Sequence, residues 1–328
     1  MTILRPGLDQ IYAPIESELK EFTRSFEKEL ESSDPLINQI HQHLLKMAGK
    51  FLRPVLVILS SKLEKNGRGS AAIDLAVAIE LIHTATLIHD DIIDNSELRR
   101  NQPSVYIKWG REISIVSGDY LYAKAFLKLA GLKDVWVNQA FAACAGVICE
   151  GEMKQIERRN NFLISEKEYL TIIHQKTAAL FQAACMGGAY FSGAGKENVE
   201  KLGSYGFRLG MAFQIVDDCL DLVGETESLG KTVGLDIYKN DVTLPLLYLF
   251  QSLGEQERKG LLEELQKDGA GLFEKIKELA IQNKAVDRAM DKARGYIEGA
   301  LGDLEAVKDS APRESLANLA HYCLERVR

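Results

Sequence analysis

Two helix-forming stretches decide the fold, and the first reads SAAIDLAVAIELIHTATLIHDDIIDN over residues 70–95. The second covers residues 197–224 and, like the first, carries the acidic pattern D-D-x-x-D close to its C-terminal end. In both stretches Ala, Leu and Ile occupy all faces of the expected helix instead of forming one apolar stripe. Because a helix that is apolar all round must be covered on every side, we expect both to be central helices of a large bundle.

The acidic patterns place like charges side by side. Residues four apart share one face of a helix, so Asp90 lies over Asp94 and Asp217 over Asp221, where their carboxylates repel. The negative end of the helix dipole adds to this repulsion. Bound Mg²⁺ removes it, because Mg²⁺ takes carboxylate oxygens and shares them with substrate phosphates. The sequence therefore predicts a metal and diphosphate site with six candidate ligands, Asp90, Asp91, Asp94, Asp217, Asp218 and Asp221.

The rest of the chain also has a helical pattern. Its apolar residues recur at spacings of three and four, which is the period of an α-helix and not of a strand. No convincing strand, repeat or domain linker is evident. We therefore predict one all-α domain over residues 1–328, a single large helical bundle with a central cavity. The other expected helices cover residues 9–31, 35–47, 52–64, 113–130, 134–158 and 166–193, and helices resume at about 236 after a loop at 225–235.

Composition excludes several classes of protein. A hydrophobic fraction of 46% with 27% charged residues is ordinary for a soluble globular protein, and a net charge of −7 argues against general nucleic-acid binding. The most apolar stretch, residues 71–89, is interrupted by Asp74, Glu80 and two histidines, which predicts a buried helix and not a membrane span. Early charges argue against a signal peptide. The five cysteines form no C-x-x-C pair, so we expect buried free thiols and a cytoplasmic location.

Basic residues near the acidic patterns supply the charge that diphosphates need. Arginine suits bidentate phosphate contacts, and lysine supplies a point charge. Taken singly, each has a simpler explanation, such as surface solvation for Arg99 and Arg100, core packing for His83, or a snorkelling side chain for Lys176. Their joint occurrence favours the binding of two diphosphates. The candidate residues are Lys50, Arg53, His83, Arg99, Arg100, Lys176 and Lys231.

The order and spacing of these residues resemble the trans-type (E-type) isoprenyl diphosphate synthases, and the resemblance runs from about residue 10 to the C-terminus. The two acidic patterns with their flanks carry most of its specificity. The matching signatures are G-K-x-x-R-P (49–54), I-H-T-A-T-L-I-H-D-D-I-I-D (82–94), R-R (99–100), G-D-Y-L (118–121), K-T (176–177), F-Q-I-V-D-D-C-L-D (213–221), G-K (230–231) and T-L-P (243–245).

The resemblance implies the isoprenoid synthase fold, a homodimer, and Mg²⁺-dependent head-to-tail condensation of isopentenyl diphosphate onto an allylic diphosphate, with three Mg²⁺ ions per active site. Asp90, Asp94 and Asp217 would hold the ions on the allylic diphosphate, with the other three aspartates ligating or supporting them. Thr177 and Gln214 would be dipoles near the allyl cation, and the released diphosphate would be the base. The resemblance further assigns Arg99, Lys176 and Lys231 to the allylic diphosphate, and Lys50, Arg53, His83 and Arg100 to isopentenyl diphosphate.

Residues before the first acidic pattern predict the product length. The growing chain should run alongside this helix, where Thr86 and Ala85 are the fourth and fifth residues before Asp90. Short-chain members of the family place bulky aromatics there or insert two residues between the aspartates, and this chain has neither device. It therefore resembles long-chain, octaprenyl-type members that make quinone side chains. Ile82 and Phe141 are candidates for the tunnel floor, although plain core packing would also explain them.

Three positions depart from the family pattern. Asn240-Asp241 stands where the family has glycine-lysine before T-x-P, which removes a cation usually near the allylic diphosphate. A carboxylate there is unfavourable unless it faces solvent or metal, so weaker allylic binding, compensation by Lys239 and altered substrate choice all stay open. Phe51 replaces a common arginine, and Asn101 replaces the glycine that commonly follows the arginine pair.

Three alternative functions stay open. A shorter product, geranylgeranyl or farnesyl diphosphate, requires the same catalytic residues. A class I terpene cyclase shares the acidic metal site and the all-α fold, but it binds one diphosphate and would normally lack the second set of cations. The third alternative is a subunit of a heteromeric prenyl synthase. Non-catalytic subunits often lose the aspartates, whereas this chain keeps all six.

Replacing Ala85 by Phe should shift the products towards short chains, because an aromatic ring would fill the space that the growing tail needs. The measurement is a radiolabelled or mass-resolved analysis of product length. An unchanged product distribution would overturn the tunnel assignment.

Overall fold

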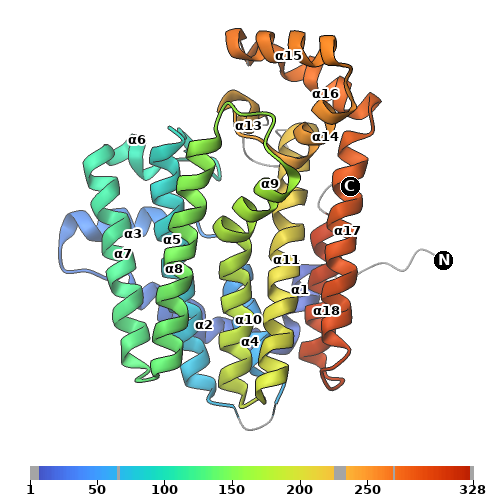
Figure 1. Ribbon diagram of the computed structural model, residues 1–328. Coiled ribbons are helices and arrows are strands. Elements are labelled where there is room, and N and C mark those ends of the chain that lie inside the picture. Colours follow the sequence, from blue (N-terminus) through green and yellow to red (C-terminus); the bar gives the residue numbers. More distant parts are fainter. Residues whose placement is uncertain (1–6, 65–66, 225–233, 269, 326–328) are drawn as a thin grey trace. The chain divides into compact units, whose positions relative to one another are not determined.

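The computed structural model describes residues 7–64, 67–224, 234–268 and 270–325, and it confirms the all-α fold (Figure 1). The first half contains α1 (Leu8–Tyr12), the 3₁₀ helix η1 (Ala13–Ile15), α2 (Glu16–Glu29), α3 (Pro35–Lys46), α4 (Leu52–Ser61), α5 (Gly69–Ile93), β1 (Leu98–Arg99), β2 (Gln102–Pro103), α6 (Val105–Trp109), α7 (Arg111–Gly131) and α8 (Val135–Arg158). The second half contains α9 (Glu166–Ile173), the π-helix η2 (His174–Ala178), α10 (Ala179–Ser192), α11 (Lys196–Val223), α13 (Leu235–Tyr238), α14 (Leu244–Ser252), α15 (Glu255–Asp268), the 3₁₀ helix η3 (Ala270–Leu272), α16 (Phe273–Gln282), α17 (Ala285–Leu304) and α18 (Ala311–Glu325).

The chain divides into two compact units. The helices α8, α11, α17 and α18 each contribute residues to both units. Unit 1 draws on Met1–Ala145, Leu180–Gly206 and Asp303–Leu319, and unit 2 on Gly146–Ala179, Phe207–Gly302 and Ala320–Arg328.

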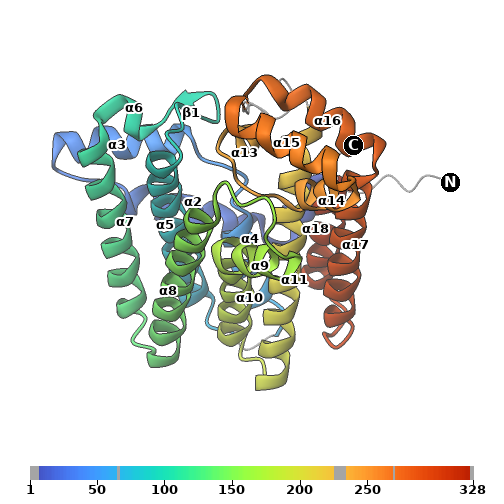
Figure 2. The ribbon, with the colours of Figure 1, turned by 45° about the horizontal axis from the view of Figure 1, so that its top comes forward.

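Several local details differ from the predicted helices. The prediction of no strand was wrong, because β1 and β2 pair antiparallel, a pair too short to give a period of two in the sequence. Figure 2 shows β1 near the C-terminal end of α5, beside α6. The helix expected at 9–31 is interrupted by η1, where Pro14 has no N–H for the helical ladder. The helix expected at 166–193 is interrupted by η2. Residues 225–233 of the expected loop lie outside the described residues.

Helix α5 is the centre of unit 1. It packs against α2, α4, α6 and α7, and the side chains of Leu75, Val77, Ile79 and Leu81 are fully buried. This burial is what an all-round apolar pattern requires. Among the helices of the described residues, α5 is the one long and apolar enough to cross a membrane, and 67% of its apolar window is buried in protein.

Two glycines of α10 allow close helix packing in unit 1. A Cβ on Gly188 would lie 2.3 Å from the carbonyl O of Val57 on α4. A Cβ on Gly187 would lie 2.6 Å from Leu75 Cδ2 and 3.3 Å from the ring of Phe141. Because no side chain fits at these distances, α10 approaches its neighbours only with glycine at both positions.

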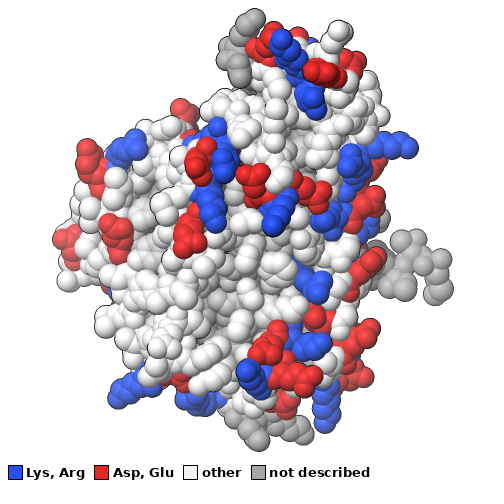
Figure 3. All heavy atoms as spheres, viewed as in Figure 1, with Lys and Arg blue, Asp and Glu red and all other residues white. Residues whose placement is uncertain are grey.

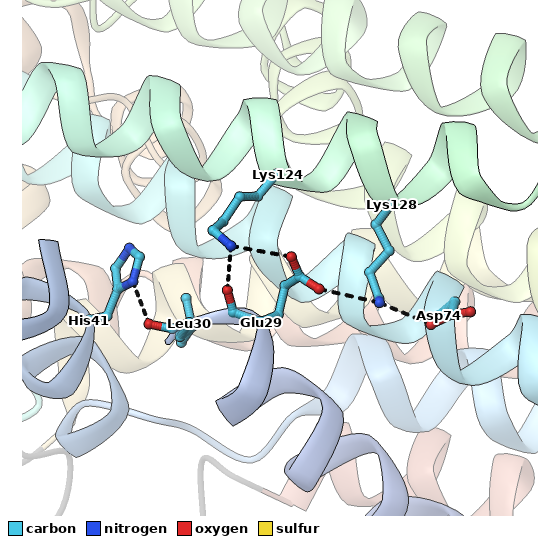
Figure 4. Close-up of polar contacts among 6 residues, drawn as sticks. All are labelled: Glu29, Leu30, His41, Asp74, Lys124 and Lys128. Carbon is cyan, nitrogen blue, oxygen red and sulfur yellow. Dashed lines mark hydrogen bonds and ion pairs between the residues drawn. The ribbon is translucent and has the colours of Figure 1, made fainter. Parts of the chain in front are cut away.

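A polar network joins the C-terminal end of α2 to α5 and α7 (Figure 4). Lys124 Nζ donates to the carbonyl O of Glu29 at 2.6 Å. Lys128 Nζ lies 3.3 Å from Glu29 Oε2 and 3.0 Å from Asp74 Oδ1. A lysine at a helix C-terminus satisfies an exposed carbonyl and interacts favourably with the helix dipole. The network therefore fixes where α2 ends against the central helices of unit 1.

Unit 2 is held together in part by Glu166 at the start of α9. Lys292 Nζ of α17 lies 2.8 Å from Glu166 Oε1, and the Tyr248 hydroxyl of α14 donates to Oε2 at 3.1 Å. The guanidinium of Arg288 lies 4.1 Å from the centroid of the Tyr248 ring. The hydrogen bond with Lys292 lowers the pKa of Glu166, so its carboxylate stays charged and joins the three helices.

All five cysteines are free thiols, as expected. The prediction that all are buried was wrong for Cys149 of α8, which is exposed. Cys149 lies four and seven residues before the exposed Met153 and Ile156, so its apolar stretch belongs to an outward helix face. The buried thiols are Cys144, Cys185, Cys219 and Cys323.

Replacing Gly188 by Ala should lower the free energy of unfolding by about 1–3 kcal/mol, because the new methyl group meets backbone atoms that cannot move aside easily. The control is Gly295→Ala in α17, where a Cβ meets nothing within 4 Å. This control should stabilise the protein by up to about 1 kcal/mol through helix propensity. Denaturant unfolding of both variants measures the effect, and equal shifts would contradict the packing argument.

Candidate active site

The first acidic pattern lies at the C-terminal end of α5 in unit 1. Asp91 is buried, whereas Asp90 and Asp94 are half-buried. The guanidinium of Arg99 on β1 binds both Asp91 oxygens, with Nε 2.9 Å from Oδ1 and 3.0 Å from Oδ2, and Nη2 2.7 Å from Oδ1. Bidentate pairs of this kind are strong and fix orientation as well as distance. Asp91 therefore positions Arg99 against the end of α5.

Arg100 occupies the turn of the β1–β2 hairpin and reaches back to the loop before α4. Arg100 and Asn101 have left-handed backbones, with φ of 50° and 61°. Asn enters this region more readily than most residues, which explains how Asn101 can stand at a position where a glycine is common. Arg100 Nη1 donates to the carbonyl O of Met47. A Cβ on Gly49 would lie 2.2 Å from Arg100 Nη2, so glycine leaves the space that the guanidinium occupies.

Arg53 of α4 and His83 of α5 form a second basic contact in unit 1. Arg53 Nη1 donates to His83 Nε2 at 3.0 Å, and the guanidinium carbon lies 4.7 Å from the centroid of the Phe181 ring. Since a guanidinium only donates, Nε2 is the acceptor and the ring proton is on Nδ1. Burial, with the charges of Arg53, Arg100 and Arg99, lowers the pKa of His83 well below its usual value. His83 is therefore a neutral imidazole at physiological pH.

The loop that carries Lys50 is anchored from two sides. The Tyr12 hydroxyl donates to the carbonyl O of Lys50 at 2.9 Å. Phe51 has a left-handed backbone with φ of 51°, and its ring centroid lies 5.1 Å from that of Phe22 and 6.0 Å from that of Phe26, both edge-on. Such aromatic pairs add stability beyond their buried area. The departure at Phe51 therefore has a packing role, because it holds the loop to α2.

A buried acid lies close to these cations. Glu80 of α5 is 8% exposed and lines a pocket with Thr84, Asp91, Arg99 and Arg100. Burial raises the pKa of Glu80 to about 7, against the attraction of Arg53 and Arg100. Glu80 thus changes its charge near neutral pH, directly beside the basic residues of the predicted diphosphate site.

The candidate chain-length residues are packed inside unit 1. Ala85, Ile82 and Phe141 are buried, and Thr86 is half-buried. The Thr86 hydroxyl donates to the carbonyl O of His83 at 2.7 Å, so its hydrogen bond is made within α5. Their influence on product length stays a prediction.

The second acidic pattern lies near the end of α11 in unit 2, and its middle aspartate is also bound. Asp218 is buried, with Oδ1 accepting from Gln214 Nε2 at 2.8 Å and Oδ2 from the Tyr169 hydroxyl at 2.7 Å. The Thr177 hydroxyl donates to Gln214 Oε1 at 2.8 Å. Burial raises the pKa of Asp218, the two hydrogen bonds oppose the rise, and the neighbouring carboxylates Asp217 and Asp221 add to it. The structure thus joins Thr177 and Gln214, two of the predicted site residues, to the acidic pattern.

Asp221 is held by the segment that precedes α14. Its carboxylate is buried, and Oδ2 accepts from the backbone N of Asp236 at 3.1 Å. Its carbonyl O accepts from the backbone N of Gly234 at 2.8 Å. Asp217 is half-buried. The predicted site residue Lys231 lies outside the described residues.

Lys176 lies in the π-helix η2 and faces α8. Its Nζ is 2.6 Å from Glu152 Oε2. A Cβ on Gly151 would lie 2.6 Å from the backbone N of Lys176, so glycine permits η2 to approach α8. Single π-turns within helices occur frequently at functional sites. In this state Lys176 is an ion-pair partner of Glu152.

The donor chemistry fits Mg²⁺. Within residues 7–64, 67–224, 234–268 and 270–325, no three Asp, Glu, His or Cys side chains converge on a preformed metal site. Mg²⁺ needs no such cage, because it usually keeps several waters and binds one or two carboxylates together with substrate phosphates. Burial is the main cause of the raised pKa of Asp218 and the carboxylates of Asp217 and Asp221 add to it, a repulsion that a divalent cation would relieve.

Sequence reasoning missed several residues that support the site. The hydrogen bond of Tyr169 with Asp218 and the ion pair of Glu152 with Lys176 join positions far apart in the chain, so no local pattern predicts them. Gly151-Glu152 does carry a signal, since a glycine inside an apolar helix often marks a close backbone approach. Glu80 carries another, because an acid within an otherwise apolar buried stretch is rare.

Comparison with known proteins places these features in a family. The polyprenyl synthetase family matches residues 34–281. The chain is 33% identical to octaprenyl diphosphate synthase of Haemophilus influenzae, over 98% of this chain and 97% of that one. It is 38% identical to the short chain isoprenyl diphosphate synthase of Methanothermobacter thermautotrophicus, over 87% and 89%. The chain belongs to the polyprenyl synthetase family.

A solved structure agrees with this assignment. The polyprenyl synthase of Caulobacter crescentus, crystallised with calcium and isoprenyl diphosphate, matches with a TM-score of 0.94 and 33% identity, over 98% of each chain. The isoprenoid synthase fold is therefore confirmed, and this member of the polyprenyl synthetase family is a prenyltransferase.

The titration of Glu80 predicts a pH dependence of stability. Its folded pKa of about 7 lies above the ordinary value of 4.5, so its contribution is present below pH 4.5 and is lost as pH rises through 7. Over this window the free energy of unfolding should fall by up to about 3 kcal/mol from this group. The pKa of Asp218 is also raised, so this group too should lower the free energy of unfolding as pH rises.

Glu80→Gln isolates the Glu80 contribution. Unfolding of wild type and variant between pH 5 and 8, with EDTA present, should give a steeper loss for wild type. Equal pH slopes would show that Glu80 does not titrate in this range.

Proposed function

We propose that this chain uses Mg²⁺ to condense isopentenyl diphosphate with an allylic diphosphate and makes a long-chain all-trans polyprenyl diphosphate. One observation carries the proposal: in each acidic pattern the middle aspartate, Asp91 or Asp218, is buried and bound by protein donors. The Mg²⁺ ligands of the proposal are the half-buried Asp90, Asp94 and Asp217, with the buried Asp221 as a further ligand or support. When bound, Mg²⁺ neutralises the leaving diphosphate.

The basic residues of unit 1 support the binding of isopentenyl diphosphate. Lys50, Arg53 and Arg100 supply donors for its phosphate oxygens, and the neutral His83 keeps the Arg53 guanidinium oriented through its hydrogen bond. Preorganised donors of this kind cost little reorganisation when substrate arrives. Residues positioned in this way can hold the double bond of one substrate against the reacting carbon of the other.

The remaining site residues act on the allylic substrate. In unit 1 Arg99 and in unit 2 Lys176 supply cations for diphosphate oxygens, and the ion pairs of Arg99 with Asp91 and of Lys176 with Glu152 keep both cations in place before binding. The Thr177 and Gln214 dipoles stabilise positive charge as the C–O bond breaks. The departing diphosphate takes the last proton, so the chain needs no separate general base.

The small side chains of Ala85 and Thr86 favour a long product, because no aromatic ring closes the helix face before Asp90. Relatives of both product classes resemble this chain, so overall identity alone does not decide the length. Ile82 and Phe141 lie deeper in the unit 1 core and are the candidates for the floor.

We further infer a cytoplasmic homodimer in which the whole chain acts as one catalytic domain, with three Mg²⁺ ions in each site. Exposed apolar residues on α7 and α8 support the dimer, because a second copy would cover them. Figure 3 shows few charged atoms over the N-terminal half of α8. The exposed apolar residues in unit 1 are Ile115, Val116 and Leu127 on α7 and Val135 on α8.

A single assay distinguishes the proposed function from its alternatives. The purified chain is incubated with Mg²⁺, isopentenyl diphosphate and, separately, each allylic primer from C5 to C20, and the products are separated by chromatography. We expect products longer than C20 from the chain alone, eluting as a dimer in size exclusion, and no product after EDTA treatment.

The alternatives give different results in this assay. Products that stop at C20 or below would show a short-chain synthase. Lack of any product from the chain alone, restored by a second protein, would show the catalytic half of a heteromer. A cyclised product that forms without isopentenyl diphosphate would show a terpene cyclase.

A further inference from the structure

Asn240-Asp241, the pair that differs from the family's glycine-lysine, makes a specific set of contacts with the end of α8 in unit 2. Asp241 is 4% exposed, and its Oδ1 accepts from Arg159 Nε at 2.9 Å while Oδ2 accepts from Gln155 Nε2 at 2.8 Å. The carbonyl O of Asn240 accepts from the backbone N of Asn160 at 3.0 Å. Asp241 therefore directs both carboxylate oxygens into unit 2, and Arg159 neutralises its charge.

A short series of hydrogen bonds continues from Asp241 to the second acidic pattern. The backbone N of Asp241 donates to the carbonyl O of Asp236 at 2.8 Å. The backbone N of Asp236 donates to Asp221 Oδ2 at 3.1 Å. Gly234, two residues earlier, donates to the carbonyl O of Asp221 at 2.8 Å. The segment fixed by Arg159 is thus the segment that holds the Asp221 carboxylate.

The backbone at both ends of this contact is left-handed. Asn160 and Asn240 both have left-handed conformations, with φ of 64° and 56°. Gly234 has φ of 76°, and a Cβ there would lie 2.5 Å from the ring of Phe273. Asn and Gly adopt this conformation more readily than other residues, so these three positions suit the path of the segment.

We propose that Arg159, Gln155 and Asp241 form a clamp that positions Asp221 and thereby sets the affinity of the second acidic pattern for Mg²⁺. The three are positioning residues that act through the backbone of Asp236. The inference rests on the proposed Mg²⁺ role of this pattern. It assigns a task to the pair Asn240-Asp241 that differs from the diphosphate contact made by the family's lysine.

The test is metal binding by variants of the clamp in the presence of inorganic diphosphate, because the metal shares the aspartate oxygens with phosphate, and a protein-free titration is the blank. Mn²⁺, a paramagnetic stand-in for Mg²⁺, is titrated into the full-length protein and the free ion is measured by electron paramagnetic resonance. Arg159→Ala and the isosteric Asp241→Asn should each weaken Mn²⁺ binding about 10–100-fold, which is typical when a group supporting a metal ligand is lost. The double variant should bind no more weakly than Arg159→Ala, because both changes break one interaction.

The neighbouring Arg158 supplies a matched control. Its guanidinium is 3.5 Å from the exposed Glu168 and takes no part in the clamp. Arg158→Ala should leave Mn²⁺ affinity unchanged. Kinetics give a second readout, since in Asp241→Asn the Mg²⁺ concentration for half-maximal rate should rise while kcat at saturating Mg²⁺ stays within about twofold.

The outcomes separate failure of the clamp from failure of the proposed function. If wild type and the clamp variants bind Mn²⁺ equally, and the variants lose only thermal stability, the clamp is structural and the inference is overturned. If wild type binds no Mn²⁺ and forms no product, the proposed function itself fails. Recovery of affinity in Arg159→Lys relative to Arg159→Ala would support the clamp.

Discussion

Repulsion among the aspartates within each acidic pattern, one at the end of α5 and one near the end of α11, is the constraint on which the proposed metal site depends. The two acidic patterns relieve it by different means. At Asp91 a guanidinium supplies a full positive charge, whereas at Asp218 the donors Tyr169 and Gln214 are neutral. Burial raises the pKa of Asp218, the hydrogen bonds from Tyr169 and Gln214 oppose the rise, and the carboxylates of Asp217 and Asp221 add to it. The same motif thus occurs in two electrostatic environments.

Unusual backbone conformations gather where substrate binding is proposed in unit 1. Phe51, Arg100 and Asn101 all have positive φ, beside Lys50 and Arg99. Such conformations cost free energy and persist only where the surroundings determine them. Here the aromatic cluster around Phe51 and the hydrogen bond from Arg100 to Met47 supply that support. The basic residues are therefore placed by loops whose shape is fixed before any ligand binds.

The features that were predictable from the sequence depend on residues close together along one helix. The all-round apolar pattern located α5 and α11, and the four-residue spacing located the aspartates at their ends. Contacts between distant positions were not predictable in this way, since Asp241 and Arg159 are 82 residues apart and Asp218 and Tyr169 are 49 apart. The carboxylate at Asp241 looked unfavourable beside a diphosphate because its partner Arg159, directly after α8, was unknown. The π-helix was missed because a segment of five residues is too short to show a change of period.

The π-helix η2 makes residues 174–178 sensitive to the deletion of a residue. A π-turn is an α-helix with one residue inserted, and each residue of an α-helix turns the next by about 100°. Removing one residue between His174 and Ala178 would restore a regular ladder and rotate everything that follows relative to α9. Either Lys176 would leave Glu152 or Thr177 would leave Gln214, so this segment should tolerate substitutions more readily than deletions.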